Sequence, residues 1–299
     1  MSFEPYPLLN PADAVLDREP GTPGGADTGH LRQVRYWATK PSVILLSVLV
    51  IVAIFAPLIA PYSPVTPNLA IKLMPPSGQH WFGTDALGMD VFSRVVYAAR
   101  IDLTVAVVSV IIGIIIGAPL GALAAYSGSW LDVVLARLAE VLQAFPVLLF
   151  AMLVLTAVGN NLVTLTILLG ILNVPVYLKM VRSVALPLRD AEFVQAARIS
   201  GHRPTSLMFK HILPNTLVPI FAQFSISAAF AVQLIAGLSF VGLGVRVPTP
   251  EWGSMIQEGA NYMVFGQWWP SVFPGLALFA AAFALTNLGH NIRQSALGE

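Results

Sequence analysis

The sequence predicts an all-α protein that crosses a membrane several times, which makes it polytopic. Hydrophobic residues make up 56% of the 299 residues, charged residues make up only 10%, and the mean hydropathy is +0.76. An average soluble domain carries about 25% charged residues. The charged side chains are therefore too few to cover a surface in water. Several segments also approach the ~20 apolar residues that a helix needs to cross a bilayer.

Six segments are expected to form the transmembrane helices. Each is uncharged or carries charge only close to one end. The third follows a polar stretch with Asp132 and Arg137 and has Glu140 at its very start. Arg137 and Glu140 share one helical face, so they could pair with each other or contact a neighbouring subunit. In the second, Gly113, Gly117 and Gly121 predict a helix-packing face, because small residues let backbones approach. The expected ranges are 42–60, 103–126, 139–158, 162–178, 216–243 and 269–289.

The distribution of basic residues predicts that both termini are cytoplasmic. With this orientation, twelve of the 16 Lys and Arg residues lie in or beside cytoplasmic segments, as the positive-inside rule requires. The other four are Lys72, Arg94, Arg100 and Arg246. Residues 1–40 are expected to be a largely flexible cytoplasmic tail. Residues 41–102 would hold the first span and an extracytoplasmic segment, and residues 103–299 a five-helix core.

The two long outer segments, 61–101 and 244–268, allow two interpretations. They mix proline, aromatic and charged residues. One interpretation is a folded cap that shields the helix ends, and the other is a docking surface for an extracellular partner. The residues alone favour neither.

Several function classes lack the residues that they need. The sequence has no cysteine and its five histidines are scattered, so no metal site is expected. It has no phosphate-binding loop of the G-x-x-x-x-G-K-[ST] type, no catalytic triad and no carboxylate dyad. No ionisable residue lies near the middle of a span, where ion coupling would require one. The chain is therefore expected to bind no cofactor and not to be an enzyme. Any energy for its work would come from another chain.

The connection between the fourth and fifth spans is the longest on the cytoplasmic side. Asp190 and Glu192 favour a helix start, since anions stabilise the positive end of the helix dipole, and Gly201 favours its end. A second short helix is expected from Pro204 to Leu213, and Pro214 would begin the fifth span. The connection, about 190–213, could bind a partner with acidic edges or lie on anionic lipid.

This connection resembles the signature loop of ABC importer permeases. "FVQAARISG", followed after nine residues by "HILPN", matches the spacing of that loop. Gln195 stands where Glu is usual, which removes a charge, and His211 stands where Ile is usual. "LAEVLQAFPVLL" and "LSFVGLGVRVPTPEWGSMI" resemble other parts of dipeptide, oligopeptide and nickel permeases, of the second or C-type subunit. The loop pattern maps to Gln195, Ala196, Ala197, Gly201, His211, Leu213 and Pro214.

The resemblance implies a type I ABC importer permease in a bacterial inner membrane, with di- or oligopeptides as cargo. It also implies a second permease subunit, two cytoplasmic ATPases that bind ATP and Mg²⁺, an extracytoplasmic solute-binding protein and surrounding lipid, but no nucleic acid. Nickel or another small solute remains an alternative cargo. An ion-coupled secondary transporter and a non-transporting scaffold are the rival classes.

Polar residues on the fifth span are candidates for the pathway. In the family this helix borders the translocation path, and side-chain amides and hydroxyls could contact a peptide backbone. Hydrogen bonds between helices would use the same groups, so both roles stay open. The candidates are Gln223, Ser225, Ser227 and Gln233.

Overall fold

The computed structural model describes residues 40–128, 130–189, 191–201 and 204–297. Most of the expected tail, residues 1–39, lies outside this range. Within the described residues every regular element is a helix, apart from one isolated bridge between Thr84 and Asp90. The predicted all-α class is therefore confirmed.

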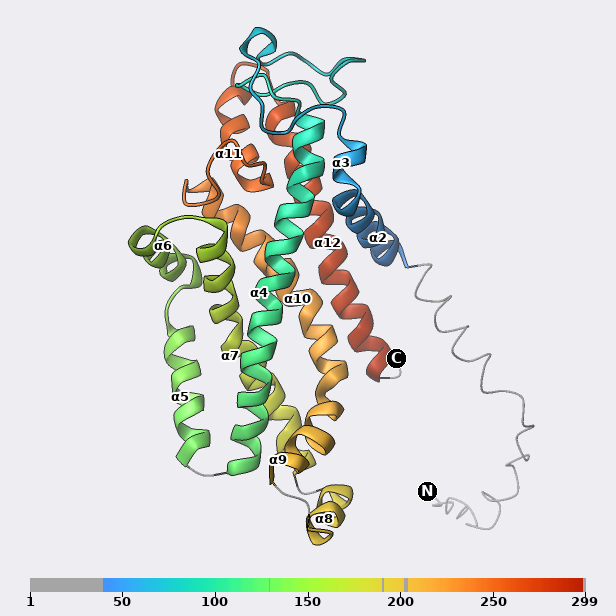
Figure 1. Cartoon of the computed structure of the whole chain (residues 1–299), viewed down its shortest axis with the longest axis vertical. Coiled ribbons are helices and arrows are strands. Elements are labelled where there is room, and N and C mark those ends of the chain that lie inside the picture. Colours follow the sequence, from blue (N-terminus) through green and yellow to red (C-terminus); the bar gives the residue numbers. More distant parts are fainter. Residues whose placement is uncertain (1–39, 129, 190, 202–203, 298–299) are drawn as a thin grey trace, which may run out of the picture.

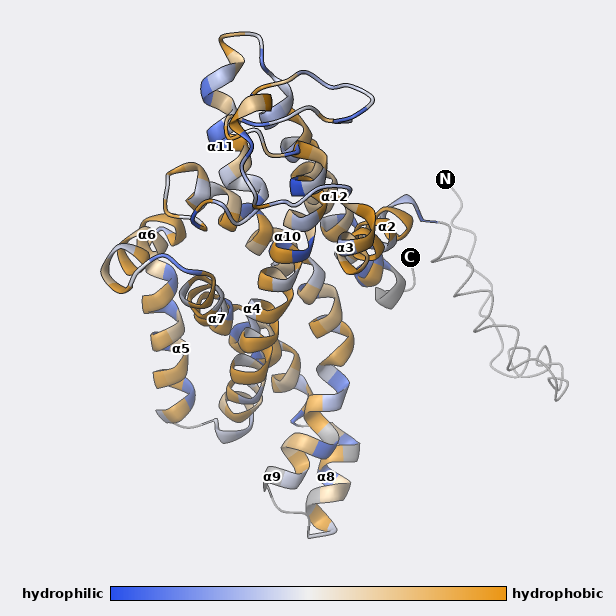
Figure 2. Ribbon diagram, turned by 45° about the horizontal axis from the view of Figure 1, so that its top comes forward, coloured by the Kyte–Doolittle hydropathy of each residue, from blue (hydrophilic) through white to orange (hydrophobic). Residues whose placement is uncertain are grey.

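Four long helices form the body of the protein (Figure 1). They are α4 (Val91–Ser127), α7 (Leu162–Leu188), α10 (Leu217–Phe240) and α12 (Trp269–Leu297). All four are long and apolar enough to cross a membrane, in α10 together with the residues from Leu213. Hydrophobic colouring dominates them in Figure 2, as expected for helices that cross the hydrocarbon core of a bilayer.

The expected glycine face on the second span is confirmed. A Cβ added at Gly113 would lie 2.5 Å from Asn173 Cβ, and one at Gly117 would lie 2.5 Å from the Val174 carbonyl oxygen. Side chains at these positions would keep the helices apart. The small residues therefore set the close packing of α4 against α7.

The span expected over 139–158 is not one continuous helix. Two helices occupy the region, α5 (Trp130–Ala144) and α6 (Val147–Val158), bent by 85° to each other. Pro146 lies at the bend. Its ring removes a backbone donor and disfavours helical geometry in the residue before it. Together α5 and α6 count as a fifth candidate span, broken in its middle.

The first apolar segment is also interrupted. Phe55 separates α2 (Pro41–Ile54) from the short α3 (Ala56–Ile59), which has Pro57 in its first turn. The 14 residues of α2 rise only ~21 Å. The helix packs on α4 and α12, where Asn291 Nδ2 donates to Ser42 Oγ at 3.1 Å.

A cap covers one end of the bundle. We use "the cap" for residues 60–90 and 241–268, which include the short helix η1 (Leu69–Ile71) and α11 (Trp252–Met263). The first segment is shorter than expected, because α4 already begins at Val91. The Trp269 indole, directly after the second segment, donates to the Thr84 carbonyl of the first at 3.0 Å, and Asp85 and Glu258 of the two segments line one small pocket. These segments thus fold together, as the cap interpretation expected.

Candidate coupling segment and buried polar sites

The connection between α7 and α10 projects from the end of the bundle opposite the cap (Figure 1). We call residues 191–201 and 204–216 the projecting segment. Its first helix, α8, spans Glu192–Ile199 and carries Glu192 in its first turn, close to the expected start. A turn with Gly201 at φ +80° follows, a conformation that glycine adopts without strain. The predicted helix and its glycine end are confirmed.

The two faces of α8 have different environments. Val194 is fully buried, in a cluster with Ala125, Ala185 and Ile212 from the ends of the long helices and the projecting segment. Ala197, one turn further, is also buried at 9% exposure. These residues attach α8 to the protein's own bundle.

The outer face of α8 is open in this chain. Gln195 and Ala196 are exposed, and Ile199 is 88% exposed. An isoleucine at this exposure is the kind of side chain that a partner covers. The signature residues Ala196 and Ala197 therefore point to different faces, which spacing alone did not reveal.

The second half of the projecting segment is an irregular helix. It consists of α9 (Pro204–Leu207), the π turn η2 (Met208–Ile212) and the 3₁₀ turn η3 (Leu213–Thr216), which leads into α10. Pro214 has no N–H for the ordinary helical hydrogen bond, which explains the change of pitch. Leu213 is half-buried and Pro214 is exposed. The side chain of His211 lies outside the described part.

The polar candidates on α10 fall in three environments. Ser225 and Ser227 are buried at 3% and 4% exposure. Gln223 is half-buried, and its Nε2 donates to Ser227 Oγ at 3.3 Å on the same helix. Gln233 is exposed.

Gln233 lines a groove between α10 and α12. The groove has a volume of about 460 Å³. Phe279 and Phe283 contribute aromatic surface, and Thr286 and Asn287 add polar groups from α12. It contains no charged side chain. The groove can therefore donate hydrogen bonds to a ligand and accept them from it, without a preference for the charge of the ligand.

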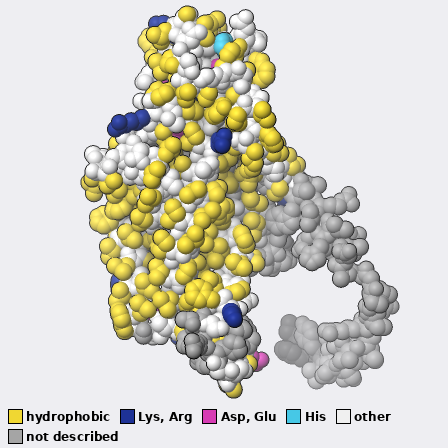
Figure 3. Space-filling view, viewed as in Figure 1, with side chains coloured by type: hydrophobic (Ala, Val, Ile, Leu, Met, Phe, Trp, Pro, Cys, Tyr) yellow, Lys and Arg dark blue, Asp and Glu magenta, His cyan; other side chains and the backbone are white. Residues whose placement is uncertain are grey.

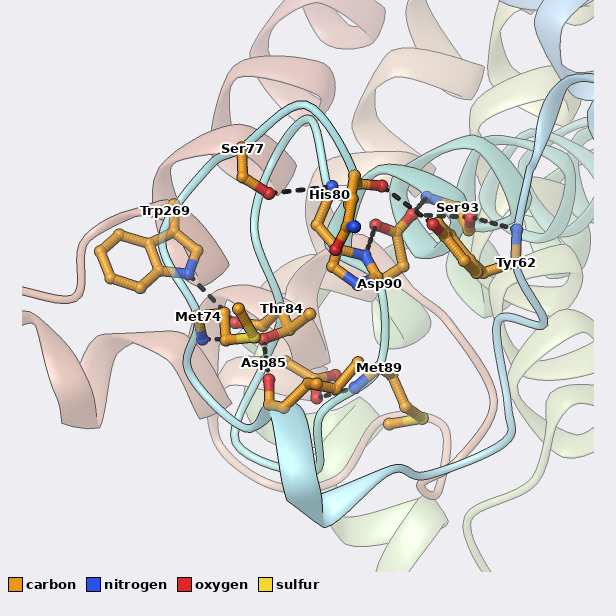
Figure 4. A network of polar contacts seen from close by, with 12 residues as sticks. Tyr62, Met74, Ser77, His80, Thr84, Asp85, Met89, Asp90, Ser93 and Trp269 are labelled. Atoms are coloured by element: carbon orange, nitrogen blue, oxygen red, sulfur yellow. Dashed lines mark hydrogen bonds and ion pairs between the residues drawn. The ribbon is translucent and has the colours of Figure 1, made fainter.

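Two carboxyl groups organise the polar network of the cap (Figure 4). Asp90 caps α4 by accepting from the Ser93 N–H at 2.8 Å, and its other oxygen lies 2.9 Å from His80 Nδ1. Asp85 accepts from the N–H groups of Leu87 and Met89, each at 2.9 Å. Burial raises the pKa of the Asp85 carboxyl, against the opposing effect of Arg94.

Arg94 joins distant segments of the cap. It is only 1% exposed, and its Nε lies 3.3 Å from Asp85 Oδ2. Its Nη1 donates to the carbonyls of Pro64 and Pro248 at 3.0 and 3.1 Å. A buried guanidinium with these partners fixes the cap to the start of α4.

Two further acids meet at the start of α11. Asp102 of α4 accepts from the Trp252 N–H at 3.1 Å, and Glu251 accepts from the N–H groups of Gly253 and Ser254 at 2.6 and 2.7 Å. Both acids are almost fully buried. Burial raises the pKa of the Glu251 carboxyl. The sequence did not reveal this pair, because Asp102 lies just outside the expected span and its partner is far along the chain.

One ion pair holds α5 beside α7, and a second lies within α5. Arg182 makes two hydrogen bonds to Asp132, of which Nη2 to Oδ2 measures 2.7 Å. Arg137 and Glu140 pair with each other at 2.8 Å. Both side chains of this pair are exposed, so the pair contributes little to stability. No cluster of His, Cys, Asp or Glu that could hold a metal occurs in the described part of the chain.

Comparison with known proteins identifies the family. Residues 117–297 match the family described as "Binding-protein-dependent transport system inner membrane component". The dipeptide transport system permease protein DppC of Alkalihalophilus pseudofirmus is 36% identical over 85% of this chain and 83% of its own length. The probable D,D-dipeptide transport system permease protein DdpC of Escherichia coli is 35% identical over 85% of each.

A third relative extends the set. The glutathione transport system permease protein GsiD of Pectobacterium atrosepticum is 36% identical over 74% of this chain and 73% of its own length. The family match begins within α4 and runs through α7, the projecting segment, α10 and α12. The chain is thus a multi-pass inner-membrane protein and belongs to the family of permease subunits of binding-protein-dependent ABC importers.

Proposed function

We propose that this chain is one of two membrane subunits that form the path for di- and oligopeptides in an ATP-driven importer. The exposed face of α8 at the end of the bundle is the observation that carries the proposal, because it offers a partner a docking surface. Relatives named for dipeptide, D,D-dipeptide and glutathione transport support a peptide cargo.

The proposal includes six spans with both termini in the cytoplasm, in the type I importer architecture. Four long helices and the bent pair α5–α6 account for five spans. The tilted unit of α2 and α3 would be the sixth, since it carries the chain from Lys40 to the cap. In this orientation the projecting segment faces the cytoplasm and the cap faces outward, toward a solute-binding protein.

Two cytoplasmic ATPases, which would bind ATP and Mg²⁺, are the proposed partners of the projecting segment. Gln195, Ala196 and Ile199 would contact an ATPase, while Val194 and Ala197 hold α8 to its own bundle. Gly201, His211, Leu213 and Pro214 shape the remainder of the segment. The chain would transmit motion and perform no catalysis of its own.

The cargo would pass along an interface with a second, homologous permease. Of the polar residues on α10, we propose Gln233 as a pathway residue, because it is exposed in the groove beside Thr286 and Asn287. Ser225 and Ser227, which are buried, would instead stabilise the bundle. Gln223 would support Ser227.

Reconstitution of the importer in liposomes tests the coupling role. Wild-type complexes are expected to take up a labelled peptide only with ATP, and uptake is expected to persist with a proton uncoupler. Replacing Ile199 by Asp places a charge in an apolar contact, so ATPase co-purification and uptake should fall at least about tenfold, the effect of ~1.4 kcal/mol. Ile199→Leu is the control and should keep both.

The same experiment examines the rival readings. Gly201→Val forces a branched side chain into a left-handed conformation and should also reduce coupling. Unchanged ATPase binding and peptide-stimulated ATP hydrolysis in both Ile199→Asp and Gly201→Val would overturn the coupling assignment. Uptake of Ni²⁺ in place of peptide would overturn the cargo, and ATP-independent uptake would indicate a secondary transporter.

A further inference from the structure

Two apolar grooves flank α4 on its cap side. One lies between α4 and α7 with a volume of about 550 Å³, and it is lined by residues that include Ile101, Val105 and Ile167. The other lies between α2 and α4 with a volume of about 390 Å³, and its lining includes Val50, Ile54 and Leu103. Arg100, Thr104 and Val108 line both grooves, so α4 separates them like a ridge.

Arg100 is the one charged side chain among the residues that line these grooves. Its side chain is exposed and makes no hydrogen bond or ion pair with the part of the chain that the structure describes. Beyond it α4 carries no exposed charge, because Asp102 is buried. In Figure 3, isolated Lys or Arg side chains lie where the cap meets the hydrophobic surface.

A ligand that fits Arg100 and the two grooves needs an anionic group and hydrocarbon chains. A guanidinium at the edge of a hydrocarbon region is costly unless an anion or water satisfies its donors. Arginine binds phosphate oxygens with paired hydrogen bonds, and its donors are fixed in a fork that suits this geometry. The grooves on either side have apolar walls that suit hydrocarbon chains.

We propose that Arg100 and the two grooves form a glycerophospholipid site. The phosphate accepts hydrogen bonds from Arg100, and the two acyl chains lie on opposite sides of α4, one in each groove. Thr104 supplies a hydroxyl just below the headgroup. A helix of another protein could occupy the grooves only if it placed a carboxylate beside Arg100. Phospholipids already carry a phosphate at the edge of the hydrocarbon region, where Arg100 lies. The bound lipid would fill the space between α2, α4 and α7.

Native mass spectrometry of the protein, purified with the subunits that accompany it, tests the site. The probes are phosphatidylglycerol and a diacylglycerol with the same acyl chains, which lacks the phosphate. Phosphatidylglycerol should bind the wild type, and Arg100→Gln should bind it about fivefold more weakly, which corresponds to ~1 kcal/mol for one basic residue near a lipid surface. The diacylglycerol should bind both proteins equally weakly.

Matched variants distinguish this site from a general attraction between basic side chains and an anionic lipid. Arg246→Gln removes a basic residue of the cap that contacts Asn160 and lines neither groove, so binding should stay at the wild-type level. Val108 lines both grooves, so Val108→Trp would place a bulky side chain where the acyl chains are proposed to lie and should lower binding as Arg100→Gln does. A phosphatidylglycerol with a photoreactive acyl chain should label α4 around Thr104 and Val108.

Equal phosphatidylglycerol binding by the wild type and Arg100→Gln would overturn the proposal. Competition by millimolar inorganic phosphate would also overturn it, because it would indicate a simple anion site. If Val108→Trp released another subunit and left lipid binding unchanged, the grooves would hold a protein helix instead. None of these measurements involves transport, so the outcome is independent of the proposed import function.

Discussion

Glu258 lies half-buried on α11, close to three other charged residues of the cap region. Burial raises the pKa of its carboxyl; Asp85 and Glu251 act in the same direction, and Arg94 opposes them. The folded protein therefore binds this proton more tightly than the unfolded chain, whose ordinary pKa is 4.5. Folding stability falls as the pH rises through the raised pKa, and it is regained as the pH falls toward the ordinary value.

Hydrogen exchange of α11 amides measures this dependence. After correction for intrinsic exchange, protection should be higher at about pH 5 than at about pH 8. Glu258→Gln keeps the shape and removes the titration, so the difference should shrink. Glu192→Gln changes an exposed acid on α8, so the difference in protection between the two pH values should stay as in the wild type. An equal pH dependence in wild type and Glu258→Gln would exclude Glu258 as its source.

The buried acids also show which residues the sequence could not identify. Asp102 stands one residue before the expected start of a span, and nothing nearby indicates that it is buried. Its burial depends on Trp252, 150 positions later, whose N–H it accepts. On α8, spacing predicted the helix and its glycine end, but the inward side of Ala197 depends on contacts with the ends of other helices. Such contacts have no local signature.

The packing of α4 on α7 makes a prediction at the level of elements. Alanine normally stabilises a helix relative to glycine by up to ~1 kcal/mol. In Gly117→Ala the new Cβ would lie 2.5 Å from the Val174 carbonyl oxygen, so the helices must separate and the unfolding midpoint should fall. In Gly275→Ala on α12 the new Cβ meets nothing within 4 Å, so the midpoint should stay or rise.

Thermal unfolding in one detergent compares the two variants directly. They make the same chemical change in two membrane helices, so they differ mainly in the space available. If both midpoints rise, the close approach of α4 and α7 is not rigid. If both midpoints fall, the lower stability of Gly117→Ala does not come from the contact between α4 and α7.

Proline positions account for the breaks in two of the expected spans. Breaks occur at Pro57 and Pro146, and the irregular turns before α10 contain Pro214. Pro119 lies inside α4 and Pro175 inside α7, yet both helices continue. A sequence shows that a proline removes a backbone donor. Whether the helix breaks depends on neighbouring helices that satisfy and pack the freed groups.

The arrangement of the whole molecule rests on its asymmetry along the long axis. The cap and the projecting segment lie at opposite ends (Figure 1), and the hydrophobic surface lies between them (Figure 3). The positive-inside rule predicts that the projecting segment faces the cytoplasm. The chain contains no cysteine, so single introduced cysteines can report this orientation without a background.

A membrane-impermeant maleimide applied to intact spheroplasts should label Lys72→Cys in the cap and Val158→Cys at the end of α6. It should label Ile199→Cys on α8 and Ser127→Cys at the end of α4 only after lysis. Ser127 and Val158 matter most, because Ser127 lies just before α5 and Val158 is the last residue of α6. The two residues therefore report on either end of the bent pair. Labelling of both from the same side would mean that α5 and α6 form a re-entrant loop. In that case the chain would cross the membrane fewer than six times, and α7 would need the opposite direction.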